Sequence, residues 1–329
     1  MYQFAKTIYP INRSVNAPGN LLTLKILKKK LKYLRIKSFK SGKKVYDWKI
    51  PHEWHIEDAY VINKKNKKKI IDFKKNNLSI VGYSKPINKV VKLKQIKNKI
   101  YYLKNKPDAI PYITSYYKKD WGFCIEYNKF KKLKKGQYKV FIDSTLKNGN
   151  LIYSDSLIPG KSKKQILLST YLCHPQMANH ELGGPILLSF LYKILKKTGP
   201  HKYSYRFLVC PENIGSAAFL HKNKKKLKNI IAGYIINCVG SGKEITYKKS
   251  RISNSLSDKA AINVIKNFGK KFIIEDFYPW GSDERQFCSP GFNLPMGLIM
   301  RKRFDKFKEY HTSLDNKKFL SIKILIETL

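Results

Sequence analysis

The chain has 329 residues, and 67 lysines and arginines against 22 aspartates and glutamates give it a formal net charge of +45. Hydrophobic residues make up 43% of the sequence and aromatic residues 13%, which excludes a wholly disordered chain. The longest apolar runs fall well short of the roughly 18–20 residues that span a bilayer, so we expect no membrane span and no signal peptide.

In the first part of the chain, the residue pattern changes near residue 43. Residues 17–36 have apolar side chains at helical spacing, with Asn20 as a candidate N-cap, so they are predicted to form a helix. From about residue 43 to 155, short β-branched and aromatic segments alternate with Asn, Pro, Gly or Lys turns. This pattern indicates a small β-rich module.

The second part of the chain alternates strands and helices. Residues 165–172 form a continuous apolar run, as expected of a strand buried on both faces. Further strands are predicted at 203–210, 230–238, 244–248 and 294–300, and helices at 185–197, 256–268 and 317–329. The alternation predicts an α/β fold with a mixed, largely parallel sheet flanked by helices.

The basic residues are almost all lysine, since only seven are arginine. Proteins that read nucleic-acid sequence rely on arginine for bidentate contacts, and no nucleic-acid-binding motif accompanies the lysines. We therefore expect no specific nucleic-acid partner, and we attribute most of the charge to a coding bias. An anionic saccharide or membrane partner is the weaker alternative. Five cysteines without CxxC spacing indicate reduced, buried thiols in a cytoplasmic protein.

Side chains that can bind a metal follow the predicted strands. Ligands of open α/β sheets bind beyond the carboxyl ends of the strands. Imidazoles and carboxylates there suit zinc, which lowers the pKa of water while a nearby carboxylate accepts the proton. Each residue alone has a structural alternative, such as a helix cap or a packing histidine. Because they follow several strands, we interpret them together as a metal site. The candidates are His174, His180, Glu181, Glu212, Asp283 and His311.

The order of these residues resembles the co-catalytic zinc aminopeptidase superfamily. The chain is most similar to a bacterial family of aminopeptidase-like proteins with an inserted β-rich domain, often described near surface-polysaccharide biosynthesis. The segments that carry this resemblance are IYPINRS (8–14), VYDWKIPHEWHIEDAYV (45–61), IPYITSYYKKDWGFCI (110–125), LSTYLCHPQMANHELGGP (168–185), PENIGS (211–216) and WGSDERQFCSPGFNLP (280–295).

The resemblance implies a domain organisation. Residues 1–42 and 155–329 would form one aminopeptidase-like α/β domain, with residues 43–154 inserted into it as a β-rich domain. Relatives often continue into a C-terminal winged-helix domain. The chain stops at Leu329, so we expect that it lacks this domain or is a fragment.

The resemblance also implies a set of zinc ligands. These are His174, Glu212, Asp283 and His311, with His180 in the place of an aspartate that bridges two metals. One imidazole nitrogen binds one metal, so the site is expected to hold one or two zinc ions.

The general base departs from the superfamily pattern. Its usual Glu-Glu pair reads Pro211-Glu212 here, which leaves Glu181, or Glu212 itself, as the catalytic base. The aspartate that usually supports the first histidine is replaced by Gln176. A subsite for a free amine would need another carboxylate, for which Glu181 and Glu284 are the candidates.

These expectations define a function and an alternative. The sequence predicts a zinc-dependent metallopeptidase that hydrolyses an amide or peptide bond, linked to surface polysaccharide biosynthesis. Its partner would be a peptide or a small substrate with an amide bond, and a homo-oligomer is left open. The alternative is a catalytically degenerate aminopeptidase fold that serves as a binding or scaffold module, since the bridging aspartate and the usual base are missing.

Overall fold

The computed structural model describes residues 1–31 and 34–329. Within them, the largest sheet has eight strands in the order β1-β10-β12-β11-β13-β16-β14-β15. Strands β12, β11, β13 and β16 run parallel at its centre. The pairs β1–β10, β10–β12 and β14–β16 are antiparallel. The expected α/β fold with a mixed sheet is confirmed. The strands are β1 (Ile36–Lys40), β10 (Asn150–Ile158), β11 (Gln165–Tyr171), β12 (Ser204–Cys210), β13 (Ile230–Ile236), β14 (Ile245–Lys248), β15 (Phe272–Glu275) and β16 (Met296–Met300).

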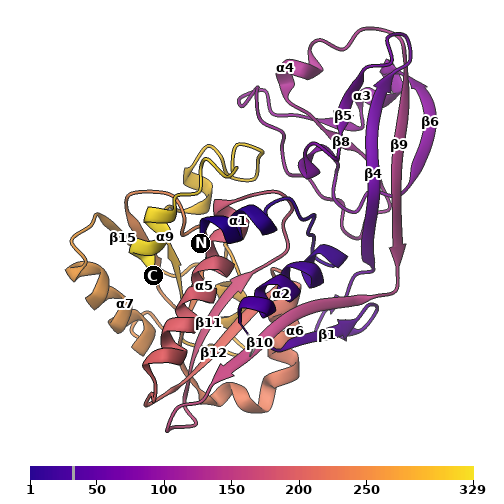
Figure 1. The fold of residues 1–329 in the computed structure, drawn as a ribbon. Coiled ribbons are helices and arrows are strands. Elements are labelled where there is room, and N and C mark those ends of the chain that lie inside the picture. Colours follow the sequence, from indigo (N-terminus) through magenta and orange to yellow (C-terminus); the bar gives the residue numbers. More distant parts are fainter. Residues whose placement is uncertain (32–33) are drawn as a thin grey trace.

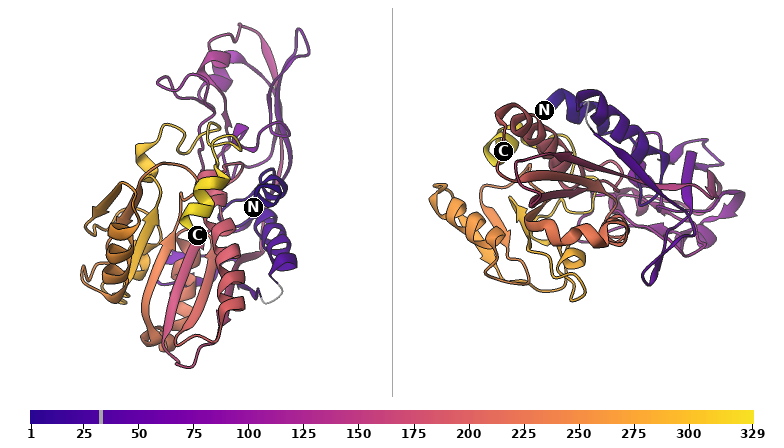
Figure 2. Two further views of the ribbon diagram at one scale, coloured as in Figure 1. Left: turned by 60° about the vertical axis from the view of Figure 1, so that its left-hand side comes forward. Right: turned by 90° about the horizontal axis from the view of Figure 1, so that it is seen from below.

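Helices cover both faces of this sheet (Figure 2). One apolar core packs α1, α2, α5 and α9 against strand residues such as Leu168 and Phe207. Strand residues of the opposite face, such as Leu167 and Leu208, belong to a second core with α6 and α8, and α7 packs beside it. The helices are α1 (Tyr2–Ile8), α2 (Pro18–Lys30), α5 (Asn179–Thr198), α6 (Ile214–Asn223), α7 (Leu256–Asn267), α8 (Glu284–Phe287) and α9 (Ile322–Thr328). Short 3-10 turns are η2 (Lys224–Asn229) and η3 (Phe304–Lys306).

Residues 41–149 lie between β1 and β10 and form what we call the small module, which projects from the main sheet (Figure 1). Its four-stranded antiparallel sheet has the order β5-β4-β9-β6. Its elements are β2 (Lys44–Val45), β3 (Trp48–Lys49), β4 (Glu53–Asn63), β5 (Lys69–Asp72), η1 (Asn77–Ser79), β6 (Ile87–Lys92), α3 (Leu93–Lys97), β7 (Ile100–Tyr101), β8 (Phe123–Cys124), α4 (Tyr127–Phe130) and β9 (Gln137–Lys147). Residues 150–154, expected in the module, belong to β10 of the main sheet.

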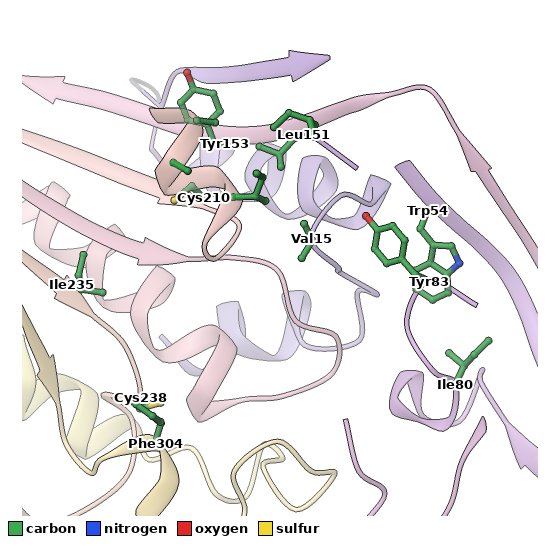
Figure 3. Close-up of a cluster of buried hydrophobic side chains, with 14 of the residues drawn as sticks. Val15, Trp54, Ile80, Tyr83, Leu151, Tyr153, Cys210, Ile235, Cys238 and Phe304 are labelled. Atoms are coloured by element: carbon green, nitrogen blue, oxygen red, sulfur yellow. The ribbon is translucent and has the colours of Figure 1, made fainter. Parts of the chain in front are cut away.

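The small module shares its core with the main sheet. Trp54 and Tyr83 stack with ring centroids 5.8 Å apart, close to Val15 (Figure 3). The Tyr83 hydroxyl accepts a hydrogen bond from the Asn16 backbone N–H at 3.1 Å. The same cluster continues to Leu151 of β10. The module therefore has an apolar and hydrogen-bonded attachment to the rest of the protein.

The boundaries of two helices differ from the expectation. Helix α2 begins at Pro18 with Ala17 as its N-cap, so Asn20 lies inside the helix, where its amide donates to the Ser14 carbonyl at 2.7 Å. The predicted helix also reached residue 36, but Ile36 begins β1, and residues 32–33 lie outside the described ranges. Helix α5 begins at Asn179, so Pro185 lies inside it rather than at its start.

Among the described residues, no helix has both the length and the apolar character needed to cross a membrane.

Candidate metal centre

Three predicted ligands from different parts of the chain meet at the carboxyl ends of the central strands. His174 follows β11, His180 lies in the first turn of α5, and His311 lies in the loop after β16. The Nε2 atom of His180 is 3.4 Å from Nε2 of His174 and 3.2 Å from Nε2 of His311. His174 and His180 are buried, so this histidine cluster is largely shielded from water.

Hydrogen bonds to Nδ1 orient two of the rings. Nδ1 of His174 lies 3.0 Å from Oε2 of Glu181, and Nδ1 of His180 lies 2.7 Å from the Tyr171 hydroxyl. With the ring proton on Nδ1, each Nε2 carries a lone pair directed into the cluster. Lone pairs that converge without a donor between them are stabilised by a cation.

The spacing of these atoms fits a zinc ion. Ligand nitrogens about 2.0–2.1 Å from a tetrahedral zinc are separated by about 3.3 Å, close to the observed Nε2 separations. Burial and the neighbouring His174 lower the pKa of His311 to about 3, and burial with both neighbouring histidines lowers the pKa of His180 well below its usual value. Neutral imidazole is the form that binds metal. The donor set of the cluster therefore fits zinc.

The carboxylate of Glu181 supports His174. Besides the contact with Nδ1, its Oε1 accepts a hydrogen bond from Nε of Arg13 at 2.9 Å, and Arg13 also donates to the His174 carbonyl at 3.0 Å. Both charged side chains are fully buried. Glu181 thus takes the supporting role of the aspartate that Gln176 replaces, and the Gln176 side chain instead accepts a hydrogen bond from the Asn77 backbone N–H. Both Glu181 oxygens are engaged.

Asp315 fixes the start of α5 and with it the position of His180. Its carboxylate accepts hydrogen bonds from the backbone N–H groups of Ala178, Asn179 and His180, at 3.3, 2.7 and 2.8 Å. Burial raises the pKa of Asp315 to about 7, although these backbone bonds act in the opposite direction. A carboxylate is favoured at a helix N-terminus by the free N–H groups and the helix dipole.

A close helix–sheet approach sets the depth of α5. A Cβ atom on Gly184 would lie 2.0 Å from Oγ1 of Thr170 and 2.4 Å from the Ile236 carbonyl oxygen. Only glycine therefore lets α5 sit against β11 and β13 at this distance. The position of His180 and Glu181, one turn earlier, depends on this contact.

Glu212 and Asp283 form a separate carboxylate pair. Ser282 donates to Oε1 of Glu212, and Ser216 donates to Oδ1 of Asp283 at 2.7 Å. Within residues 1–31 and 34–329, Oδ2 of Asp283 is buried without a hydrogen-bond partner. Burial raises the pKa of Glu212 to about 7, and burial together with Glu212 raises the pKa of Asp283 well above its usual value.

The carboxylate pair does not join the histidine cluster in one compact set of donors. Among the described residues, two groups of three have metal-competent atoms that all lie within 4.8 Å of one another: the three histidines, and Cys173 with His174 and Glu181. The Glu212 backbone N–H donates to Sγ of Cys173 at 3.3 Å, which places Glu212 beside the residue that precedes His174. The five predicted ligands therefore lie at one end of the sheet in two groups, the cluster of three histidines and the pair of carboxylates.

The remaining carboxylate considered for an amine subsite is also paired. Oε1 of Glu284 accepts a hydrogen bond from Nζ of Lys248 at 2.9 Å, and both side chains are buried. Lys248 also donates to the Trp280 carbonyl at 2.6 Å. This ion pair anchors the loop that carries Asp283. Like Glu181, Glu284 has a cation of the protein itself as its partner.

Tyrosines form a wall around the histidines, and one of them comes from the small module. Tyr112 packs edge-on against His174 and His311, with centroids 5.3 and 5.2 Å apart, and its backbone N–H donates to the His311 carbonyl at 2.9 Å. Tyr310 stacks on His311 at 3.9 Å. Sequence reasoning missed these tyrosines, Tyr171, Arg13 and Asp315. The available signals were weak: Arg13 is one of seven arginines, and Asp315 is one of 22 acidic residues.

Comparisons with known proteins agree with this architecture. A family model described as a domain of unknown function (DUF4910) matches residues 2–329. A Clostridium acetobutylicum protein with the provisional name polysaccharide biosynthesis protein with aminopeptidase-like domain is 44% identical over 316 residues, which cover 96% of this chain and 72% of that protein.

Solved structures are similar over nearly the whole chain. The crystal structure of a provisionally named peptidase from Clostridium acetobutylicum has a TM-score of 0.97 at 43% identity, over 99% of this chain and 76% of that one. A zinc aminopeptidase from Bacillus subtilis has a TM-score of 0.67 at 12% identity, over 99% of this chain and 91% of that one. The second likeness concerns the fold alone. The resemblance inferred from the sequence is confirmed.

Proposed function

The chain belongs to the DUF4910 family, and from that premise we propose that it is a zinc-dependent, aminopeptidase-like hydrolase of an amide or peptide bond. The observation that carries the proposal is the convergence of three Nε2 atoms, from His174, His180 and His311, at separations of 3.2 and 3.4 Å. These three residues would hold one zinc ion. Zinc supplies Lewis acidity, which lowers the pKa of water and polarises a carbonyl group.

Glu212 is the proposed general base, in preference to Glu181. Glu181 already holds Arg13 and His174, and a carboxylate bound on both oxygens is poorly placed to exchange a proton. Glu212 has a pKa raised to about 7 by burial, and only its Oε1 has a hydrogen bond in the described residues, from Ser282. A carboxylate with such a pKa can accept a proton from water and return it to a leaving amine.

Asp283 is proposed to assist Glu212 in proton transfer rather than to bind the zinc ion of the histidine cluster. Burial and the neighbouring charge of Glu212 raise the pKa of Asp283, which favours its protonated form, and its unpartnered Oδ2 leaves room for a polar group. A second zinc bound by Glu212 and Asp283 is the variant of the proposal that metal stoichiometry distinguishes.

Substrate, location and domain organisation follow as further parts of the proposal. A peptide or a small amide-bearing molecule is the proposed substrate, and the name of the 44% identical relative supports a link to polysaccharide biosynthesis. The five cysteines are free and buried, which supports a cytoplasmic location. The separate sheets of the small module and the main fold support an insertion into an aminopeptidase-like domain.

One observation favours the alternative of a non-hydrolytic binding module. The carboxylates of Glu181 and Glu284 each have a buried cation of the protein as a partner, so the negative charge that would attract a substrate amine is already balanced in both. In this alternative, the site binds metal and a ligand without cleaving it. The two functions share the histidine cluster and differ only in turnover.

Metal content and turnover test the proposal together. Purified protein is expected to contain zinc, to lose it on His180→Ala substitution, and to hydrolyse one or more aminoacyl p-nitroanilides. Glu212→Gln should keep the histidine-bound zinc and lose hydrolysis. Zinc binding without hydrolysis of any amide substrate would favour the binding module. A protein that binds no zinc would contradict both.

A further inference from the structure

The small module contains a cavity of about 650 Å³ whose lining includes no residue of the carboxylate pair or of the histidine cluster. It lies between β5, α4 and the start of β9, in the part of the molecule that projects from the main sheet (Figure 1). Ligand sites of proteins typically measure about 300–1,000 Å³. The cavity therefore has the size of a site for a small molecule.

The rim of the cavity carries an excess of positive charge. Six lysines and two acidic residues line it. Two of the lysines have ion pairs, Lys69 with Asp72 at 3.5 Å and Lys129 with Glu126 at 2.7 Å. The other four have no ion pair to any described residue. They are Lys68, Lys75, Lys132 and Lys134. Like charges gathered around one opening repel each other, and an anionic group relieves that repulsion.

The inner lining of the cavity is aliphatic rather than aromatic. Ile70 and Leu133 are half-buried and offer apolar surface to a ligand, whereas the other apolar lining residues, Ile71, Ile110, Ile125 and Cys124, are at most 7% exposed. The tyrosine of the lining, Tyr138, is buried and donates its hydroxyl to the Lys134 carbonyl at 2.6 Å. A bare sugar would find no exposed aromatic face to stack on here, whereas an aliphatic chain would remove apolar surface from water.

We propose that this cavity binds an anionic amphiphile: a molecule with an aliphatic chain that packs against Ile70 and Leu133 and a phosphate or carboxylate head that meets the four unpaired lysines. The proposal does not rest on the hydrolytic function. The site is distinct from the metal centre because none of the lining residues belongs to the histidine cluster or the carboxylate pair.

The cavity has a direct structural connection to the metal centre. The backbone N–H of Ile110 donates to Oγ of Ser313, and the Ile110 carbonyl accepts from the Ser313 N–H, both at 2.9 Å. Ile110 and Cys124 also pack in one apolar cluster with Met177, which lies between His174 and His180. The wall of the cavity thus continues into the segments that carry the histidines.

Calorimetric titration of the full chain with dodecyl phosphate, below its critical micelle concentration, tests the proposal. Binding is expected to weaken with added salt and to be much tighter than that of inorganic phosphate or of uncharged dodecyl maltoside. Titration with dodecanoate identifies the preferred head group. Equal binding of dodecyl maltoside, or of inorganic phosphate alone, would overturn the proposal.

Three variants locate the ligand. Lys132→Gln/Lys134→Gln is expected to weaken dodecyl phosphate about tenfold, whereas the matched pair Lys163→Gln/Lys225→Gln, with exposed lysines outside the cavity, leaves it unchanged. Ile70→Trp fills the cavity and should abolish binding, and its unfolding temperature shows whether it remains folded. His180→Ala should bind normally, because the head does not sit on the metal. Equal losses in the two lysine pairs, or a loss in His180→Ala, would refute the site.

Discussion

His174 and Glu181 are joined by a 3.0 Å contact between Nδ1 and Oε2, and the carboxylate is held from its other side by Arg13. The first turn of α5 therefore supplies one histidine of the cluster, His180, and the carboxylate that orients another. The carboxylate of Asp315 fixes that turn by accepting hydrogen bonds from the backbone N–H groups of the turn. The geometry of the cluster is thus set by a helix start that is itself held by residues distant in the sequence.

Glu181→Gln should weaken both the metal site and the fold. A glutamine amide presents one oxygen and one NH2 group, so it cannot accept from both Arg13 and His174. Zinc affinity is expected to fall about 10–100-fold, as for other groups that support a metal-binding histidine. The buried Arg13 charge loses its partner, which should cost about 3–5 kcal/mol of unfolding free energy. Chelator competition and urea unfolding of the metal-free protein measure the two effects.

Glu57→Gln is the matched control for that substitution. The Glu57 side chain is 64% exposed and pairs with His55 at 3.2 Å on the surface of the small module. Its replacement should change the unfolding free energy by less than about 0.5 kcal/mol and leave zinc affinity unaltered. If Glu181→Gln behaved like this control, the support of His174 by Glu181 would be ruled out.

Tyr171→Phe should act on the metal site with little effect on the fold. Its hydroxyl contacts Nδ1 of His180 at 2.7 Å, and without it the nearest polar partner of Nδ1 is Sγ of Cys238 at 3.6 Å. The ring proton is then no longer held on Nδ1, so zinc affinity should fall about tenfold. The unfolding free energy of the metal-free protein should fall by about 1 kcal/mol.

Tyr101→Phe, at a tyrosine that is 37% exposed in the small module, provides the comparison for Tyr171→Phe. Chelator competition should give this variant the zinc affinity of the unsubstituted protein. Equal affinities in both variants would mean that the Tyr171 hydroxyl does not orient His180.

The sequence located the metal-competent residues because their positions follow from strand order. A strand buried on both faces reads as an apolar run, and residues just beyond its carboxyl end must lie at the same edge of the sheet. His174 and His311 were predictable in this way. The separation of the metal-competent residues into a histidine cluster and a carboxylate pair could not be predicted, because it depends on side-chain directions at several strand ends.

Long-range contacts explain the remaining differences. The contact between Arg13 and Glu181 joins residues 168 positions apart, and no local pattern encodes it. The start of α5 was expected at Pro185, because proline favours the first turn of a helix. Instead the Asp315 carboxylate caps the backbone near residue 179, so a tertiary contact extends the helix beyond the local signal.

Gly184→Ala should displace α5 from the sheet. The added Cβ would meet Oγ1 of Thr170 and the Ile236 carbonyl at distances that no real methyl group tolerates. We expect a loss of about 1–3 kcal/mol in unfolding free energy, with weaker zinc binding because His180 moves with the helix. Gly291→Ala is the control, since its Cβ would have no atom within 4 Å. Comparable stability of the two variants in urea would contradict the close packing of α5.

Asp155→Asn tests an ion pair that joins β10 to the centre of the main sheet. Oδ1 and Oδ2 of Asp155 accept from Nε and Nη2 of Arg206, each at 2.7 Å, and Lys37 contacts the same carboxylate. Burial alone would raise the pKa of Asp155, but Arg206 and Lys37 outweigh it and lower the pKa below its usual value of 3.8. At about pH 7 the substitution should cost about 3–5 kcal/mol, because it leaves the Arg206 charge buried without its anion.

The pH dependence of that cost has a definite sign. A carboxyl group with a lowered pKa in the folded protein binds fewer protons there than in the unfolded chain. Its contribution to the unfolding free energy is therefore fully present at pH values above the unfolded-state pKa of 3.8. It is lost as the pH falls through the folded-state value. The difference in unfolding free energy between the unsubstituted protein and Asp155→Asn should therefore be constant from about pH 7 to about pH 5 and shrink toward about pH 3. Asp276→Asn, whose side chain is 83% exposed in its pair with Lys249, should show a small difference throughout. Urea unfolding at each pH gives the comparison, and a difference for Asp155→Asn that grew on acidification would exclude a lowered pKa.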